Sequence, residues 1–229
     1  MKKIITAALA ISFLITLPFV VCAQEQQAPR EPIKELLKEP SQELPKGKAG
    51  AFARIEKTVS RVNAVASEFR QERRLAMLKE PVVSTGRFYY EKPDKLRWEF
   101  LSPDQSGFLV NGKLAKQWKG KDNPPEALDL QQNLFIRAIF DQILAWTKAD
   151  FAWVEQRYTV AVVKEDPIAL KLVPRSSKEK KYIDHLLISF EADTQYPNAV
   201  DIVEKGGDST HLRFFNMIIN NSPQKELFE

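Results

Sequence analysis

The sequence has little cysteine, histidine and glycine: one cysteine, two histidines and eight glycines among 229 residues. Since Cys22 is the one cysteine, the chain contains no internal disulfide, and its core has to hold without a covalent cross-link. Neither His185 nor His211 belongs to a Cys/His/Asp spacing typical of a metal site. The sequence also lacks the G-x-G-x-x-G, P-loop and H-E-x-x-H motifs. We therefore expect no cofactor and no metal site.

A nucleophile motif is also missing. Residues 207–211 read Gly-Asp-Ser-Thr-His, but they lack the second glycine of G-x-S-x-G and its strand-turn-helix context. We interpret this segment as a hairpin loop, predict that the protein is not an enzyme, and name no catalytic residue. A hydrolase that uses Ser209 or a carboxylate is the alternative.

The chain has no strong excess of one charge. Its 34 Lys and Arg residues oppose 30 Asp and Glu residues, for a formal net charge of +4. No Arg-rich run or alternation of basic and aromatic residues accompanies this small excess, so we predict no nucleic-acid partner.

The first residues are typical of an export signal. Lys2 and Lys3 precede an apolar run over residues 4–21, and a polar run follows Ala23. This pattern predicts a signal peptide over residues 1–23, cleavage after Ala23, and a periplasmic location. A membrane anchor is one alternative. Acylation of Cys22 is another, although Val21 is bulkier than the residue that usually precedes a lipidated cysteine.

Residues 24–48 contain four prolines among balanced charges and almost no aromatic residues. Such a composition predicts a tether rather than a folded unit. The remaining residues, 49–229, are predicted to form one domain.

Hydrophobic periodicity predicts the elements of that domain. Apolar residues at Phe52, Ile55, Val59 and Val62 indicate one face of a helix. Alternating or β-branched runs then predict about ten strands, with a hairpin turn at Asn111-Gly112. The predicted strands include 66–72, 86–90, 95–100, 108–110, 113–118, 151–154, 158–163, 168–173, 183–190, 199–204 and 211–219. This succession favours a mainly β fold, an antiparallel and strongly curved sheet with helices packed on one face.

Residues 134–146 differ from their surroundings because they are apolar on almost every side. Their length favours a helix over a strand, and a helix with so little polar surface has to be covered on more than one side. We interpret this segment as a lid over the sheet.

Several motifs together resemble the outer-membrane lipoprotein carrier (LolA-like) family. Residues 66–71 (ASEFRQ) and 84–100 (STGRFYYEKPDKLRWEF) follow its F-x-Q and G-x-aromatic-basic-P-W patterns, and Pro103 and Asn111-Gly112 come next. In the rear half, residues 170–174 (LKLVP) and 210–220 are similar to the L-x-x-P and T-x-x-x-F-x-N segments. The resemblance covers about residues 50–229. The chain departs from the well-known carriers at Lys92, where they have arginine.

The resemblance implies an unclosed antiparallel half-barrel with a helical lid, and a monomeric periplasmic carrier. Such a carrier receives lipoproteins from an inner-membrane ABC transporter complex, shields their acyl chains, and delivers them to an outer-membrane receptor. A carrier or sensor of another envelope lipid is the alternative. The residue before the family's proline, Lys92, becomes a candidate lid contact, with a solvated charge as the simpler interpretation.

The strand alternation and the lid together suggest which side chains face a lipid. For any one of them taken alone, ordinary core packing is the simpler explanation, because alternation indicates that a residue is buried and not that it contacts a ligand. The candidate cavity residues are Phe69, Phe88, Leu96, Trp98, Phe100, Phe108, Ile139 and Ile143.

Overall fold

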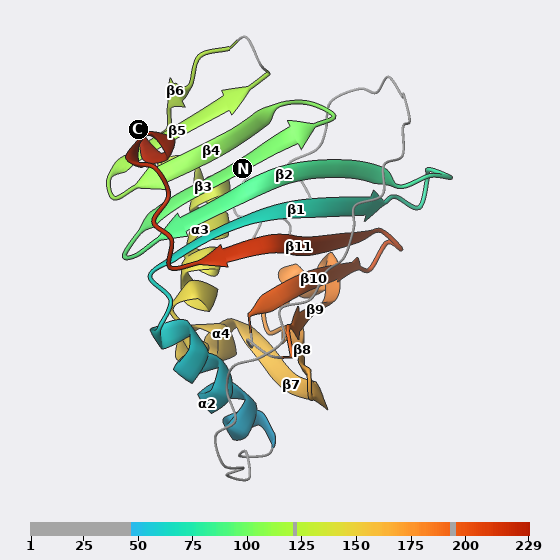
Figure 1. Cartoon of the computed structure of the whole chain (residues 1–229). Helices are drawn as coiled ribbons and strands as arrows, with labels where there is room; N and C mark the ends of the chain where they lie inside the picture. The colour runs from blue at the N-terminus through green and yellow to red at the C-terminus, as the bar shows by residue number, and fades with distance from the viewer. Residues whose placement is uncertain (1–46, 121–122, 193–195) are drawn as a thin grey trace.

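The computed structural model describes residues 47–120, 123–192 and 196–229, and it has the predicted curved sheet (Figure 1). The predicted signal peptide and nearly all of the predicted tether lie outside the described residues. Helix α2 (Gly47–Ser60) already begins at the end of the predicted tether. None of the helices in the described part of the chain is long and apolar enough to cross a membrane.

The front half of the chain forms a meander in which each strand pairs with the next in antiparallel fashion. Its strands are β1 (Ala64–Arg74), β2 (Val82–Glu91), β3 (Lys95–Ser102), β4 (Ser106–Asn111), β5 (Leu114–Lys119) and β6 (Glu126–Ala127). The hairpin predicted at Asn111-Gly112 joins β4 to β5, and Gly112 has the positive φ of 59° that such a tight turn favours. The two-residue strand β6 was not predicted, because its sequence carries no alternation.

The rear half forms a second antiparallel meander. Its strands are β7 (Tyr158–Glu165), β8 (Ile168–Pro174), β9 (Ile183–Phe190), β10 (Pro197–Glu204) and β11 (Ser209–Ile219). The two meanders join through β1 and β11, which place Phe69 opposite Phe214 and Gln71 opposite Leu212. The sheet order is thus β6-β5-β4-β3-β2-β1-β11-β10-β9-β8-β7. Since β6 and β7 are edges, the sheet is an unclosed half-barrel, and the fold prediction is confirmed.

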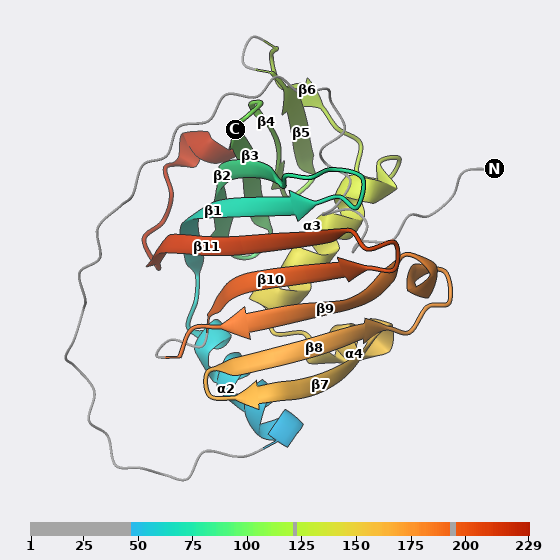
Figure 2. The ribbon, with the colours of Figure 1, turned by 90° about the vertical axis from the view of Figure 1, so that its right-hand side faces the viewer.

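Two further helices follow the first meander, α3 (Leu134–Thr147) and α4 (Phe151–Arg157). Helix α3 crosses the concave face of the sheet, and α2 and α4 lie near the end formed by β7 and β8 (Figures 1 and 2). The predicted helix over 134–146 is confirmed, but the predicted strand over 151–154 is wrong. There the Asp150 side chain accepts a hydrogen bond from the Trp153 N–H at 2.9 Å, which caps a helix. Phe151 and Val154, three residues apart, both face the core.

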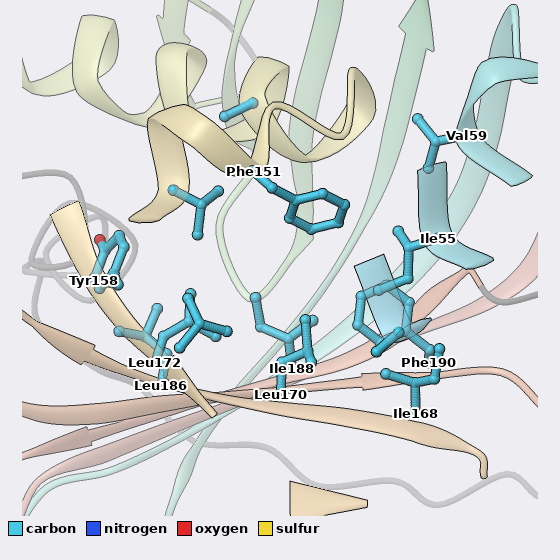
Figure 3. Packing of buried hydrophobic residues seen from close by; sticks show 14 of the residues in the cluster. Ile55, Val59, Phe151, Tyr158, Ile168, Leu170, Leu172, Leu186, Ile188 and Phe190 are labelled. Atoms are coloured by element: carbon cyan, nitrogen blue, oxygen red, sulfur yellow. The ribbon is translucent and has the colours of Figure 1, made fainter. Parts of the chain in front are cut away.

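Strand alternation fills the concave side of the sheet with apolar side chains in two clusters. One lies between α2, α4 and strands β7 to β10, where Ile55 of α2 and Phe151 of α4 meet Ile168 and Ile188 (Figure 3). The other lies against β1 to β5 and β11. Helix α3 contributes to both clusters, which explains why its sequence is apolar on more than one side.

The end of the chain covers part of the convex face. The 3₁₀ helix η2 (Lys225–Phe228) packs on β3 and β4. The Arg97 guanidinium donates to the Leu227 carbonyl at 3.1 Å, and the Asn111 amide donates to the Phe228 carbonyl at 3.3 Å. The Phe228 side chain is fully buried as a result. The 3₁₀ helix η1 (Glu179–Lys181) lies between β8 and β9.

Candidate functional site

A cavity of about 150 Å³ lies between α3 and the concave face of the sheet. Its wall draws on both meanders and on the ends of α2 and α3, so it brings together segments that are far apart in the sequence. Almost all of the lining side chains are apolar or aromatic. The lining residues are Val59, Val62, Val65, Phe88, Trp98, Gln142, Ile143, Trp146, Thr147, Leu186, Ile188, Tyr196, Pro197, Val200, Leu212, Phe214 and Met217.

Three aromatic rings form one wall of the cavity. Phe88 and Trp98 are directly opposite each other on β2 and β3, and their ring centres are 5.6 Å apart in an edge-on arrangement. Phe214 of β11 lies 6.0 Å from Phe88 and 6.2 Å from Trp98, again edge-on. Such arrangements stabilise aromatic clusters beyond the area they bury. This wall is therefore a well-packed apolar surface.

The opposite wall is the inner face of α3. The helix begins at Asn133, whose side chain accepts a hydrogen bond from the Ile136 N–H at 3.1 Å. From its second half, Ile143 and Trp146 point their apolar side chains at the sheet and line the cavity. The helix thus forms one wall of the cavity with bulky side chains of its own.

Three predicted cavity residues line the cavity: Phe88, Trp98 and Ile143. Four others, Phe69, Leu96, Phe100 and Phe108, are buried in the same apolar cluster but do not reach the cavity. The side chain of Ile139 lies outside the described part of the structure. Contact of any of these residues with a lipid stays a prediction.

Phe69 supports the cavity wall from beneath. Its ring lies 4.6 Å from the Trp98 ring and 5.3 Å from the Phe100 ring. The same ring occupies the space over Gly86 of the neighbouring strand, where an added Cβ would lie 2.3 Å from the Phe69 Cζ atom. The position of Trp98 therefore depends on a glycine at residue 86.

Lys92, the candidate lid contact, lies at the end of α2 rather than at α3. Its ammonium group donates to the backbone carbonyls of Val59 and Ser60, each at 3.3 Å. These carbonyls are among the last of α2, where a helix attracts a positive charge. Lys92 thus ties the β2–β3 turn to the helix that contributes Val59 to the cavity. Its role as a latch stays a prediction.

Sequence reasoning missed most of the wall that β9, β10 and β11 provide. Leu186, Val200, Leu212 and Phe214 belong to strands that were predicted, so alternation alone could have marked them as inward-facing. The pairing of β1 with β11 decides which buried residues border the cavity. No local sequence pattern predicts that pairing.

The polar groups of the cavity are few. The Tyr158 hydroxyl, next to the cavity on β7, donates to the Gln142 Oε1 atom of α3 at 3.3 Å. Burial is the main cause that raises the pKa of Tyr158, and the negative charge of Glu179 raises it further. Burial also raises the pKa of Tyr196, which lines the cavity. Both tyrosines are therefore neutral hydroxyls at physiological pH.

Neither a Ser209–histidine pair nor a cluster of metal ligands is found among the described residues. No hydrogen bond joins Ser209 to a histidine there, although His211 follows two residues later on the same strand. His211 instead contacts Asp201 through Nδ1 and accepts a hydrogen bond from Arg213 through Nε2. Within the same residues, no group of three His, Cys, Asp or Glu side chains could hold a metal ion.

Comparisons with known proteins identify one family. The family model described as "Outer membrane lipoprotein carrier protein LolA" matches residues 60–229. No curated protein sequence matches the chain.

Several solved structures are similar to the chain at low sequence identity. A LolA superfamily protein from Nitrosomonas europaea is 10% identical, with 81% of this chain and 98% of that chain covered and a TM-score of 0.44. MucB in its complex with MucA from Pseudomonas aeruginosa is 12% identical, with coverage of 78% and 59% and a TM-score of 0.44. The Mycobacterium tuberculosis lipoprotein LppX is 11% identical, with coverage of 76% and 96% and a TM-score of 0.43. The family assignment rests on the family model, which spans both meanders.

Proposed function

Because the chain belongs to the LolA family of outer membrane lipoprotein carrier proteins, we propose that it is a periplasmic carrier of acyl chains. It takes up the acyl chains of lipoproteins in the cavity beneath α3, shields them from water, and moves them from the inner to the outer membrane. An inner-membrane ABC transporter complex would load it, and an outer-membrane receptor would unload it.

One observation carries this proposal: an apolar cavity between α3 and the sheet in a member of a carrier family. The lining has no lysine, arginine, aspartate or glutamate, so it offers nothing to a charged ligand. An acyl chain, in contrast, gains about 0.8 kcal/mol for each CH₂ group that leaves water. The cavity therefore suits hydrocarbon.

The size of the cavity fits a carrier that binds its cargo reversibly. An apolar cavity of about 150 Å³ holds a molecule about the size of benzene, and thus only a short part of an acyl chain. A complete chain of about sixteen carbons needs Ile143 and Trp146 of α3 to move away from the sheet. The energy of separating α3 from the sheet offsets part of the roughly 12 kcal/mol that a fully buried chain would gain, so release stays possible.

Binding of a fluorescent fatty-acid ester probe, which carries no charge, to the purified protein tests the proposal. Trp98 and Trp146 line the cavity, so their emission should change when the probe binds. Ile143→Glu should weaken probe binding at least tenfold, because it places an unpaired carboxylate in the cavity. The matched control is Val163→Glu, since Val163 is an exposed apolar residue of β7 and its replacement should leave binding unchanged. Circular dichroism has to show that both variants are folded.

The cargo is tested with inner-membrane vesicles that hold an acylated lipoprotein. The protein should release this lipoprotein into solution as a complex, and it should not bind a form without acyl chains. A folded Ile143→Glu variant that binds the probe as well as wild type would contradict the proposed site. Recovery of free membrane lipids without any lipoprotein would favour the alternative, a carrier or sensor of another envelope lipid.

A further inference from the structure

One polar side chain is buried in the apolar wall that α3 presents to the cavity. Gln142 is 4% exposed and lines the cavity beside Ile143. Burial of an amide costs free energy unless its donor and acceptor atoms both find partners. The partners of Gln142 therefore decide whether it is a structural residue or a binding residue.

Only one end of the Gln142 amide is satisfied. Its Oε1 atom accepts the hydrogen bond from the Tyr158 hydroxyl, and Tyr158 is 1% exposed in the core between β7 and α4 (Figure 3). The Nε2 atom has no hydrogen-bond partner among the described residues. Since Tyr158 fixes the oxygen, the NH₂ group with its two hydrogens is the end left for a further acceptor.

The other polar side chain of α3 at the cavity is already engaged as a donor. The Thr147 hydroxyl donates to the Leu144 carbonyl at 3.1 Å within the same helix. Of these two side chains, Gln142 alone has hydrogens to offer to a ligand. The Tyr196 hydroxyl, which also lines the cavity, is neutral as well. Neutral donors in an apolar wall match a neutral acceptor, whereas a carboxylate would be buried there without a balancing charge.

From this geometry we propose that the Gln142 Nε2 group donates a hydrogen bond to the carbonyl oxygen of an ester- or amide-linked acyl chain. The inference rests on the proposed function and adds a ligand class to it. The site prefers a linked acyl chain both to a free fatty-acid anion and to plain hydrocarbon. Tyr158 acts as a positioning residue, since it holds the amide with its NH₂ group free.

The test compares three ligands of matched chain length: methyl octanoate, octanoate ion and decane. The full-length protein, Gln142→Met and Gln132→Met are titrated with each ligand, and tryptophan emission reports binding. Met has nearly the shape of Gln without its donor, and Gln132 is an exposed residue just before α3, so its variant is the matched control. We expect Gln142→Met to weaken ester binding about threefold to tenfold and to leave decane binding unchanged or stronger.

A second readout observes the hydrogen bond itself. The infrared carbonyl band of an isotope-labelled methyl octanoate should lie at lower frequency on the wild-type protein than on Gln142→Met. Tyr158→Phe should shift the band part of the way, because the amide loses its anchor. A diacylated lipopeptide and a diacyl phospholipid distinguish the two natural sources of the carbonyl. The one whose affinity falls in Gln142→Met is the source that the site recognises.

Several results would overturn the inference. Equal loss of ester and decane binding in Gln142→Met would make Gln142 a packing residue. Unchanged ester binding in Gln142→Met, or a carbonyl band at the same frequency on both proteins, would exclude the proposed hydrogen bond from Gln142 to the ester. Wild-type protein that binds decane as tightly as the ester would leave the carrier proposal standing without a carbonyl site. Wild-type protein that binds none of the ligands would overturn both proposals.

Discussion

Two glycines, one on each face of the sheet, show how single residues determine what packs on its backbone. A Cβ atom at Gly86 would lie 2.3 Å from the Phe69 Cζ atom, and one at Gly107 would lie 2.4 Å from the Trp118 Cζ2 atom. In each case an aromatic ring of a neighbouring strand lies over the bare backbone. The absence of a side chain at these positions lets large rings approach the backbone closely, and Phe69 in turn contacts Trp98 at the cavity.

We expect Gly86→Ala to lower the free energy of unfolding by about 1–3 kcal/mol, because the Phe69 ring and the Glu99 backbone carbonyl, whose oxygen would lie 2.1 Å from the added Cβ, both have to move. Chemical denaturation followed by circular dichroism measures the change. Gly206→Ala is the matched control: no atom lies within 4 Å of its added Cβ, and the change should stay within about 0.5 kcal/mol. Equal effects of the two substitutions would show that the sheet does not depend on the absence of a side chain at Gly86.

At the scale of elements, α3 is the part that both forms a wall of the cavity and joins the two apolar clusters. Ile136 and Phe140 pack in the cluster of β1 to β5, whereas Ala145 packs in the cluster of β7 to β10. The Asn133 side chain caps its N-terminus, and its first turn has no acidic side chain. The stability of the lid therefore depends on one capping side chain and on contacts with two separate parts of the core.

Removal of that cap should loosen α3 more than the sheet. We expect Asn133→Ala to cost about 1 kcal/mol of stability and to speed amide hydrogen exchange in the first turns of α3. Asn133→Asp keeps an acceptor oxygen for the Ile136 N–H and should restore the wild-type exchange. If Asn133→Asp exchanged as fast as Asn133→Ala, the hydrogen bond at the cap would not be what stabilises the helix.

Elements with a strong local pattern could be predicted from the sequence, and those shaped by distant contacts could not. In β3 the alternation of Leu96, Trp98 and Phe100 predicted both the strand and its buried face. Residues 151–154 are too few for a helical repeat to be told from an apolar strand, and the Asp150 cap was overlooked. Part of the cavity was anticipated through Phe88, Trp98 and Ile143. The wall from β9 to β11 was not, because it depends on how the meanders join.

The whole molecule contains a buried tyrosine in each apolar cluster, Tyr90 in one and Tyr158 in the other. Burial raises the pKa of both hydroxyls above their ordinary value near 10. In the unfolded chain these groups lose their protons near pH 10, whereas the folded protein retains them at higher pH. The unfolded state therefore binds fewer protons there, and the stability of the whole protein falls as the pH rises above about 10.

We expect Tyr158→Phe to be less stable than wild type by about 1 kcal/mol at pH 7, because it loses the hydrogen bond to Gln142. This deficit should shrink or reverse near pH 11. The wild-type protein loses stability there because folding keeps Tyr158 protonated, and the variant has no hydroxyl at this position to keep protonated. Urea denaturation at both pH values measures the change, and Tyr182→Phe, at an exposed residue, is the control. A deficit that is the same at both pH values would contradict the prediction.

The pairing of β1 with β11 has a consequence for the order in which the protein can fold. The backbone N–H of Asn63 meets the Asn220 side chain across 157 residues of sequence, and the strands beside them are neighbours at the centre of the sheet. Contacts between such distant parts of a chain form slowly. During synthesis, β1 of the front meander has no β11 to pair with until the last strand has been made. Until then part of the apolar face of the front meander is exposed to water, and such an incompletely folded chain is prone to aggregation. A ribosome-bound chain that lacks β11 therefore has no cavity to fill.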